Sequence, residues 1–252
     1  MLESKQVTSS QKNHNSSIHS QMISPLLKRA LFDLKSKKKL FSLIDIGCGQ
    51  GDLLYLLKKG NYLKQARVTG IDIDKKAIQV FKKKIPWAKA IVADASHLKM
   101  LKKGSFDFVI CNQVIEHVED DEALILEIKR LLKTGGFLYL TSVLKKWYGL
   151  YWHRNKFGQI VVDPTHVREY ASSKEFTNLL TKQKFSLKNL KVIPAGLPLG
   201  DYFLLLLAQV GLIKMSNIKF YYLDNPKIYQ MAKWFSLPLP GYATIIVLAK
   251  KK

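Results

Sequence analysis

Three alternate glycines, Gly47, Gly49 and Gly51, follow a short apolar run at residues 43–46 and precede a leucine-rich stretch. This order predicts a buried strand, a tight turn and the start of a helix. Glycine lets the backbone adopt unusual dihedral angles and lets a ligand approach closely. Amides at a helix N-terminus also favour anionic groups such as a carboxylate. The turn is therefore a candidate ligand site, with a purely structural turn as the alternative.

Acidic residues follow two further predicted strands. Asp72 ends the segment 67–72, at about the distance from the glycines expected of a ribose-binding carboxylate in a strand–helix–strand unit. Asp94 follows the segment 90–93, where it either contacts a ligand or caps a helix. The glycine spacing differs from the Gly-x-Gly-x-x-Gly fingerprint of dinucleotide sites. These residues favour a ribose-containing ligand that is not a dinucleotide.

The elements that must position these residues alternate between strands and helices, which is typical of a parallel α/β sheet. Strands are predicted at residues 42–46, 67–72, 90–93, 106–111, 137–143, 187–193 and 243–249. Helices are predicted from Pro25, at 52–59, 75–84 and 121–132, and from Ser172 or Ser173 to about 180. Residues 1–22 are polar and predict a mobile arm. Residues 23–252 then form one domain, with substrate-side insertions at about 144–170 and 195–241.

The segment from Leu43 to Val143 resembles the cofactor half of class I S-adenosylmethionine-dependent methyltransferases. The glycine turn resembles the first motif of that family. The sequence from Phe106 to Val118 resembles the small-molecule enzymes of ubiquinone and menaquinone biosynthesis. The resemblance implies an α/β, Rossmann-like, seven-stranded, mostly parallel sheet with an antiparallel last strand and helices on both faces. It also implies methyl transfer from S-adenosyl-L-methionine to a small molecule, with apolar acceptors among the candidates.

The same resemblance implies which residues contact the cofactor. The glycines would line its methionine part, with Asp45 near the amino group. Asp72 would accept hydrogen bonds from both ribose hydroxyls, and Asp94 would accept one from the adenine amino group. The complete implied set lies at the ends of four strands: Asp45, Gly47, Gly49, Gly51, Asp72, Ile73, Asp94, Ala95, Asn112 and Gln113.

His117 is the candidate catalytic residue. It follows the strand at 106–111, at the sheet edge where ligands bind in such folds, and imidazole suits general-base catalysis near neutrality. A structural histidine that braces a loop is the alternative interpretation. The scattered histidines have no evident metal-ligand spacing, so the sequence predicts no metal.

Four further residues are candidates for substrate contact. Trp147 and Trp152 belong to an aromatic and basic stretch, for which packing on the rim of the sheet is the alternative. His166 and Arg168 belong to a segment that resembles one common in small-molecule methyltransferases. Loop-fixing hydrogen bonds are the alternative role for this pair.

The net charge of +22 raises the question of an anionic partner, but only 5 of the 41 basic residues are arginines. Specific recognition of phosphates and bases tends to use arginine. The motifs of amino-methylating and cytosine-methylating nucleic-acid enzymes are also absent from the sequence. We therefore expect a small-molecule acceptor rather than nucleic acid. An RNA or protein methyltransferase steered by charge and a non-catalytic cofactor-binding protein remain the alternative functions.

The cellular setting follows from cysteine content and hydropathy. The two cysteines, Cys48 and Cys111, lie in separate predicted strand-edge motifs, which suggests no disulfide and fits a reducing cytoplasm. No apolar run reaches the roughly 20 residues of a membrane span. The stretches 202–213 and 219–222 together predict an apolar, basic-edged cover, which either contacts a membrane peripherally or is a buried cap helix. The sequence leaves the oligomeric state open.

Overall fold

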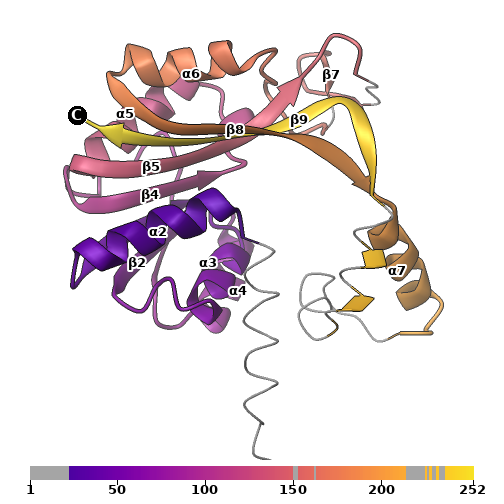
Figure 1. Ribbon diagram of the computed structural model, residues 1–252, viewed down its shortest axis with the longest axis horizontal. Coiled ribbons are helices and arrows are strands. Elements are labelled where there is room, and N and C mark those ends of the chain that lie inside the picture. Colours follow the sequence, from indigo (N-terminus) through magenta and orange to yellow (C-terminus); the bar gives the residue numbers. More distant parts are fainter. Residues whose placement is uncertain are drawn as a thin grey trace, which may run out of the picture.

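The computed structural model describes residues 23–149, 153–161, 163–213, 225, 227–228, 231–232 and 236–252. The predicted arm at 1–22 lies outside the described residues. A seven-stranded sheet with the order β3-β2-β1-β4-β5-β9-β8 forms the centre of the molecule (Figure 1). Its strands are β1 (Phe41–Ile46), β2 (Ala66–Asp72), β3 (Lys89–Val92), β4 (Phe106–Asn112), β5 (Leu132–Lys145), β8 (Phe185–Pro198) and β9 (Ser236–Lys251). A two-stranded ribbon of β6 (His153–Arg154) and β7 (Ile160–Val161) stands apart from it.

The predicted fold class is confirmed. Neighbouring strands from β3 through β5 pair in parallel, and β9 pairs antiparallel with both β5 and β8. The helices are α2 (Pro25–Lys37), α3 (Asp52–Lys59), α4 (Lys75–Lys84), α5 (Asp121–Leu131), α6 (Ser173–Lys182) and α7 (Leu199–Gln209), with a short 3-10 helix η1 (Ile115–His117). Figure 1 shows α2, α3 and α4 on one face of the sheet and α5 and α6 on the other.

The side chains of β1 contribute to the hydrophobic cores on both faces of the sheet. Phe41 and Leu43 belong to the hydrophobic core on the side of α2, α3 and α4. Ile44 and Ile46 belong to the core on the side of α5 and α6. Because successive side chains of a strand point to opposite faces, a central parallel strand needs apolar residues on both faces, and β1 provides them.

Polar side chains start three of the helices. The carboxylate of Asp74 accepts a hydrogen bond from the backbone of Lys76 at the start of α4, and Asp120 does the same for Ala123 in α5. Ser172 caps α6, as one of the two predicted serines. These caps satisfy amides that have no partner inside the helix.

The last two strands of the sheet are longer than predicted. They extend beyond 187–193 and 243–249 into the predicted insertion at 195–241, where Gly196 still pairs with Pro238. This extension contains prolines, and there β9 pairs with β8 alone, because its pairing with β5 reaches only as far as Tyr242. Proline is tolerated in strands at edges and irregularities because no ladder hydrogen bond is lost there.

A smaller correction concerns the start of β5. The helix predicted to reach residue 132 ends at Leu131, and β5 begins at Leu132. Thr134–Gly136 lies within β5, where pairing with β4 shifts its register. In the part of the chain that the structure describes, no helix has the length and apolar character needed to cross a bilayer.

Candidate functional site

The glycine turn after β1 has the predicted strand–turn–helix form. All three glycines adopt positive φ angles of +71°, +53° and +81°. The backbone N–H groups of Gly47 and Cys48 both donate to the carbonyl of Ile71 at 2.8 Å, which ties the turn to the end of β2. Gly51 is the N-cap of α3. Positive φ values are strained for residues with a Cβ atom, so this backbone path depends on glycine.

The three glycines differ in the space around them. A Cβ atom on Gly47 would lie 2.2 Å from Val114 Cγ2, and one on Gly51 would lie 2.4 Å from Ile85 Cδ1. A Cβ atom on Gly49 would have no heavy atom within 4 Å. Gly47 and Gly51 are therefore constrained by packing as well as by φ, whereas Gly49 is constrained by φ alone.

We expect Gly47→Ala to reduce the free energy of unfolding by about 2–4 kcal/mol, because overpacking adds to backbone strain. Gly49→Ala is the matched control and should lose only about 1–2 kcal/mol, from strain alone. Urea denaturation of both variants measures the difference. Equal losses for the two variants would contradict the assigned contact with Val114.

Asp72 supports the turn as well as facing the cavity. Its Oδ2 accepts a hydrogen bond from the Gly49 amide at 2.7 Å, and its Oδ1 accepts one from the Asp74 amide at 2.9 Å. A carboxylate has about four acceptor positions, so these two bonds leave capacity for a ligand hydroxyl. The sequence indicated a ligand-binding acid, and the structure shows that Asp72 also joins the turn to the residue that caps α4.

A cavity of about 580 Å³ lies at the carboxyl ends of β1, β2, β3 and β4. This volume is within the usual range of small-molecule sites. Seven residues that the sequence predicted line it: Gly47, Asp72, Ile73, Asp94, Ala95, Gln113 and His117. The sequence analysis had not assigned Ser96, Val114 or Glu119, which also line it.

Four predicted cofactor residues are not among those that line the cavity: Asp45, Gly49, Gly51 and Asn112. Asp45 is 2% exposed at the end of β1. Burial, followed by the charge of Asp72, raises the pKa of Asp45 to about 8. Asn112 is held by buried Thr141, whose hydroxyl donates to Asn112 Oδ1 at 3.0 Å and accepts from the Gln113 amide at 3.0 Å. The sequence analysis missed Thr141, because only strand pairing places it beside the loop after β4.

His117 has a defined ring orientation at the edge of the cavity. Its Nδ1 lies 3.2 Å from the carbonyl oxygen of Thr165. The hydroxyl of Thr165 also lies 3.2 Å from Nδ1, but it donates its hydrogen to Asp163 Oδ1 at 2.6 Å. Nδ1 therefore donates to the carbonyl oxygen, and in the neutral ring Nε2 is the atom that can accept a proton. The predicted base and the predicted brace are therefore compatible, one on each ring nitrogen.

His166 lies edge-on against His117, with ring centroids 4.9 Å apart. Its side chain is buried, and its Nδ1 lies 2.8 Å from Glu169 Oε1. Burial would lower the pKa of His166, but its hydrogen bond to Glu169 and the nearby carboxylates outweigh this effect and raise the pKa. His166 is not among the residues that line the cavity.

Glu116 is the buried acid next to this histidine pair, and the sequence analysis had not assigned it. It is fully buried, and its Oε2 accepts a hydrogen bond from Ser142 at 3.0 Å. Burial raises its pKa, against the opposing effect of that hydrogen bond. Its backbone carbonyl accepts from the Val167 amide at 2.8 Å, which joins η1 to the segment that carries His166.

The remaining substrate candidates do not gather at the first cavity. Trp147 is 92% exposed, and Trp152 lies outside the described residues. Arg168 forms an ion pair with Asp121 at 2.7 Å and donates to the backbone of Glu119. The loop-fixing role that was the alternative for Arg168 is therefore present in the structure.

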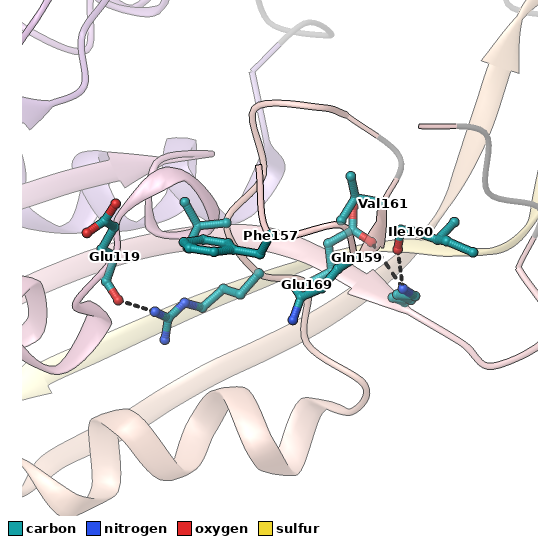
Figure 2. A pocket seen from close by; sticks show the side chains of 9 residues that line it. Glu119, Phe157, Gln159, Ile160, Val161 and Glu169 are labelled. Atoms are coloured by element: carbon teal, nitrogen blue, oxygen red, sulfur yellow. Dashed lines mark hydrogen bonds and ion pairs between the residues drawn. The ribbon is translucent and has the colours of Figure 1, made fainter. Parts of the chain in front are cut away.

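Arg168 also borders a second cavity, of about 550 Å³. Its lining includes the apolar side chains of Phe157, Ile160 and Val161 and the carboxylates of Glu119 and Glu169, which are labelled in Figure 2. Glu119 lines both cavities, so the two are adjacent. The second cavity combines apolar side chains with charged groups of both signs.

Residues 44–140 match the family described as the methyltransferase domain. They also contain the glycine turn, both acids and His117, in the arrangement just described. Residues 44–140 are thus similar in sequence to a methyltransferase domain. This finding confirms the resemblance inferred from the glycine turn and from the sequence around His117.

Curated proteins are similar to part of this chain. The ubiquinone biosynthesis O-methyltransferase of Dechloromonas aromatica is 34% identical over 107 residues, which are 40% of this chain and 43% of that protein. This chain therefore spans less than half the length of that relative.

Solved structures show the fold beyond the methyltransferase domain. Phosphoethanolamine N-methyltransferase 2 of Haemonchus contortus, in complex with S-adenosyl-L-methionine, covers 98% of this chain and 58% of its own, with a TM-score of 0.55 and 18% identity. The 4+2 cyclase SpnF covers 89% of this chain and 80% of its own, with a TM-score of 0.58 and 18% identity. Since a cyclase shares it, the fold does not by itself specify methyl transfer.

Proposed function

We propose that this protein transfers a methyl group from S-adenosyl-L-methionine to a small-molecule acceptor. The observation that carries the proposal is the cavity in which the left-handed turn at Gly47, the carboxylates of Asp72 and Asp94, and His117 meet. Its position at the carboxyl ends of parallel strands is where ligands bind in open α/β sheets. The family match of residues 44–140 supports the same function.

The residues suggest how the cofactor would be held. Asp72 has acceptor capacity for the ribose hydroxyls, and Ile71 and Ile73 border the cavity beside it as apolar surfaces for adenine. Asp94 is half exposed at the same cavity. Gly47 leaves room for the methionine part, and Asp45 beneath the turn places an ionisable carboxyl near its amino group.

The cofactor, when bound, supplies an electrophilic methyl group on sulfur. The protein then has to align the acceptor with that group and exclude water, and both contributions come from shape. A hydroxyl acceptor must also lose its proton, and His117 Nε2 is placed to accept it. A hydroxyl acceptor also agrees with the O-methyltransferase name of the matched relative.

We further propose that the second cavity receives part of an apolar acceptor, because Phe157, Ile160 and Val161 line it next to Glu119.

The other predicted functions have less support. An RNA or protein substrate is not favoured, since the relative described above is named for a small-molecule pathway. Cofactor binding without methyl transfer is the second candidate, and the fold shared with a cyclase is the observation behind it. Cytoplasmic location, peripheral membrane contact and the oligomeric state stay predictions or open questions.

The direct test is calorimetric titration of the full chain with S-adenosyl-L-methionine and S-adenosylhomocysteine, with NAD as the control ligand. We expect both adenosyl ligands to bind at sub-millimolar concentration and NAD not to bind. Asp72→Asn should weaken binding by about 1–3 kcal/mol, because hydroxyl partners are left unpaired. Because one amide oxygen cannot replace both backbone contacts, this variant should also lose some stability without ligand.

Asp74→Asn is the matched control, because Asp74 caps α4 two residues away and does not line the cavity. It should retain wild-type affinity for the cofactor. Incubating cell extracts with methyl-labelled cofactor then tests for transfer. Failure of both adenosyl ligands to bind would refute the cofactor assignment, and binding without any labelled product would favour the non-catalytic alternative.

A further inference from the structure

Three potential metal ligands meet beside the cofactor cavity, although they come from distant parts of the chain. Glu116 and His117 belong to η1, and His166 belongs to the segment before α6. One carboxylate oxygen or ring nitrogen from each of these residues lies within 4.8 Å of those of the other two. The sequence analysis predicted no metal because the spacing of the histidines along the chain suggested none. The fold brings the two histidine rings into contact.

The Nδ1 atom of each histidine ring already has a hydrogen-bond partner. His117 Nδ1 donates to the carbonyl oxygen of Thr165, and His166 Nδ1 lies 2.8 Å from Glu169 Oε1. Metal-binding histidines almost always donate their second ring N–H to a carbonyl or carboxylate in this way, which fixes the ring and makes the free nitrogen more basic. The other nitrogen in each ring is Nε2, which has no hydrogen-bond partner among the residues that the structure describes.

Glu116 provides an independent observation. Its side chain is fully buried, and its Oε1 has no hydrogen-bond partner among the residues that the structure describes. The other oxygen, Oε2, accepts a hydrogen bond from Ser142 at 3.0 Å. A buried polar atom without a partner is costly and calls for an explanation. A cation between Glu116 and the two imidazoles would give this oxygen its missing partner.

We propose that Glu116, His117 and His166 bind one divalent transition-metal ion of the zinc type. A set of two imidazoles and one carboxylate suits Zn²⁺, whereas Mg²⁺ and Ca²⁺ prefer oxygen ligands. Three protein ligands leave a coordination position open, as in catalytic zinc sites. Because His117 also lines the cofactor cavity, that position is available to a ligand in the cavity.

The chemical role of the ion rests on the proposed function, but its binding does not. A metal-bound hydroxyl group loses its proton more easily than a free one. An acceptor hydroxyl bound at the open position would thus become a better nucleophile for the methyl group. Its proton would pass to solvent, since His117 Nε2 is then occupied by the metal. This arrangement replaces direct proton transfer to His117 by activation through the ion that His117 holds.

Titration of the chelator-treated, full-length protein with Co²⁺ and Zn²⁺ tests the site. We expect the protein to bind one Co²⁺ ion per chain and to show the visible absorption of Co²⁺ bound by nitrogen and oxygen ligands. Added Zn²⁺ should displace the Co²⁺ and abolish this absorption. His166→Ala should weaken Zn²⁺ binding at least about 100-fold, and Glu169→Gln about 10–100-fold, the usual effect of an outer partner. His153→Ala, at an exposed histidine of β6, is the matched control and should bind Zn²⁺ as wild type does.

Glu116→Gln separates the proposed site from general loss of structure, because it preserves shape and keeps the Ser142 contact possible. It should reduce Zn²⁺ affinity while leaving S-adenosylhomocysteine affinity near that of wild type. Absence of stoichiometric Co²⁺ binding, or equal affinity in wild type, His166→Ala and Glu169→Gln, would overturn the proposal. Metal binding without methyl transfer would instead refute the proposed function and leave the site standing.

Discussion

Replacing His117 by alanine is expected to lower methyl-transfer turnover about 10²–10⁴-fold, the usual contribution of a general base. Affinity for S-adenosyl-L-methionine should stay near wild type, because the hydrogen bond of His117 reaches Thr165 and not the glycine turn. The imidazole borders the cavity, and Nε2 is the ring nitrogen that is not bonded to Thr165. The loss is therefore expected whether that nitrogen accepts the proton itself or holds an activating cation.

The measurement combines turnover, cofactor affinity and thermal melting on one variant, with the acceptor found by methyl labelling. His153→Ala is the control for loss of an exposed imidazole elsewhere and should keep full turnover. A bracing role alone would give a different pattern, in which stability and cofactor affinity fall together and turnover at saturation is retained. That pattern would contradict a chemical role for His117.

Asp45→Asn is expected to stabilise the ligand-free protein at pH 8 by up to about 5 kcal/mol, the value of a pKa shift of about four units. The pKa of Asp45 is raised to about 8 by burial and by Asp72, from 3.8 when unperturbed. The native protein therefore keeps a proton that the unfolded chain releases above pH 4. Stability from this group is present at low pH and is lost as the pH rises from about 4 to 8. Asparagine does not titrate, so the stability of the variant lacks this dependence on pH.

Urea denaturation of wild type and Asp45→Asn at pH 5 and pH 8 measures this difference. The stabilisation should be much smaller at pH 5, where the wild-type carboxyl is protonated in the native state. A cationic ligand amino group near Asp45 would favour the charged form, so cofactor binding near pH 7 should release a proton in wild type and none from this position in the variant. Equal stability differences at both pH values would show that Asp45 is not held neutral.

Much of the cofactor cavity could be predicted because its determinants are local. An apolar run of strand length, glycines that tolerate positive φ and an amphipathic stretch specify β1, the turn and α3 within about 15 residues. Asp72 and Asp94 follow further parallel strands, and the ends of such strands meet at one edge of a sheet. The sequence was therefore sufficient to predict that one cavity would be lined by Gly47, Asp72, Asp94 and His117.

Element ends and side-chain partners were harder to predict. The extension of β8 and β9 past their prolines depends on pairing between segments some 40 residues apart, as in Gly196 with Pro238. The contact of Asp72 with the Gly49 amide, and that of Thr141 with Asn112 and Gln113, depend on how neighbouring strands align. Such contacts depend on register, which local propensity does not contain.

The sequence by itself determined the class of fold and the edge of the sheet at which a ligand binds, because hydrophobic period and glycine placement act over short distances. Only the tertiary structure brought His166 against Glu116 and His117, across some 50 residues of chain. That approach is made by backbone contacts such as the Val167 amide to the Glu116 carbonyl, which form when η1 and the segment before α6 pack together. No periodicity in the chain encodes it, since burial of unrelated elements against one another decides which of their polar groups meet.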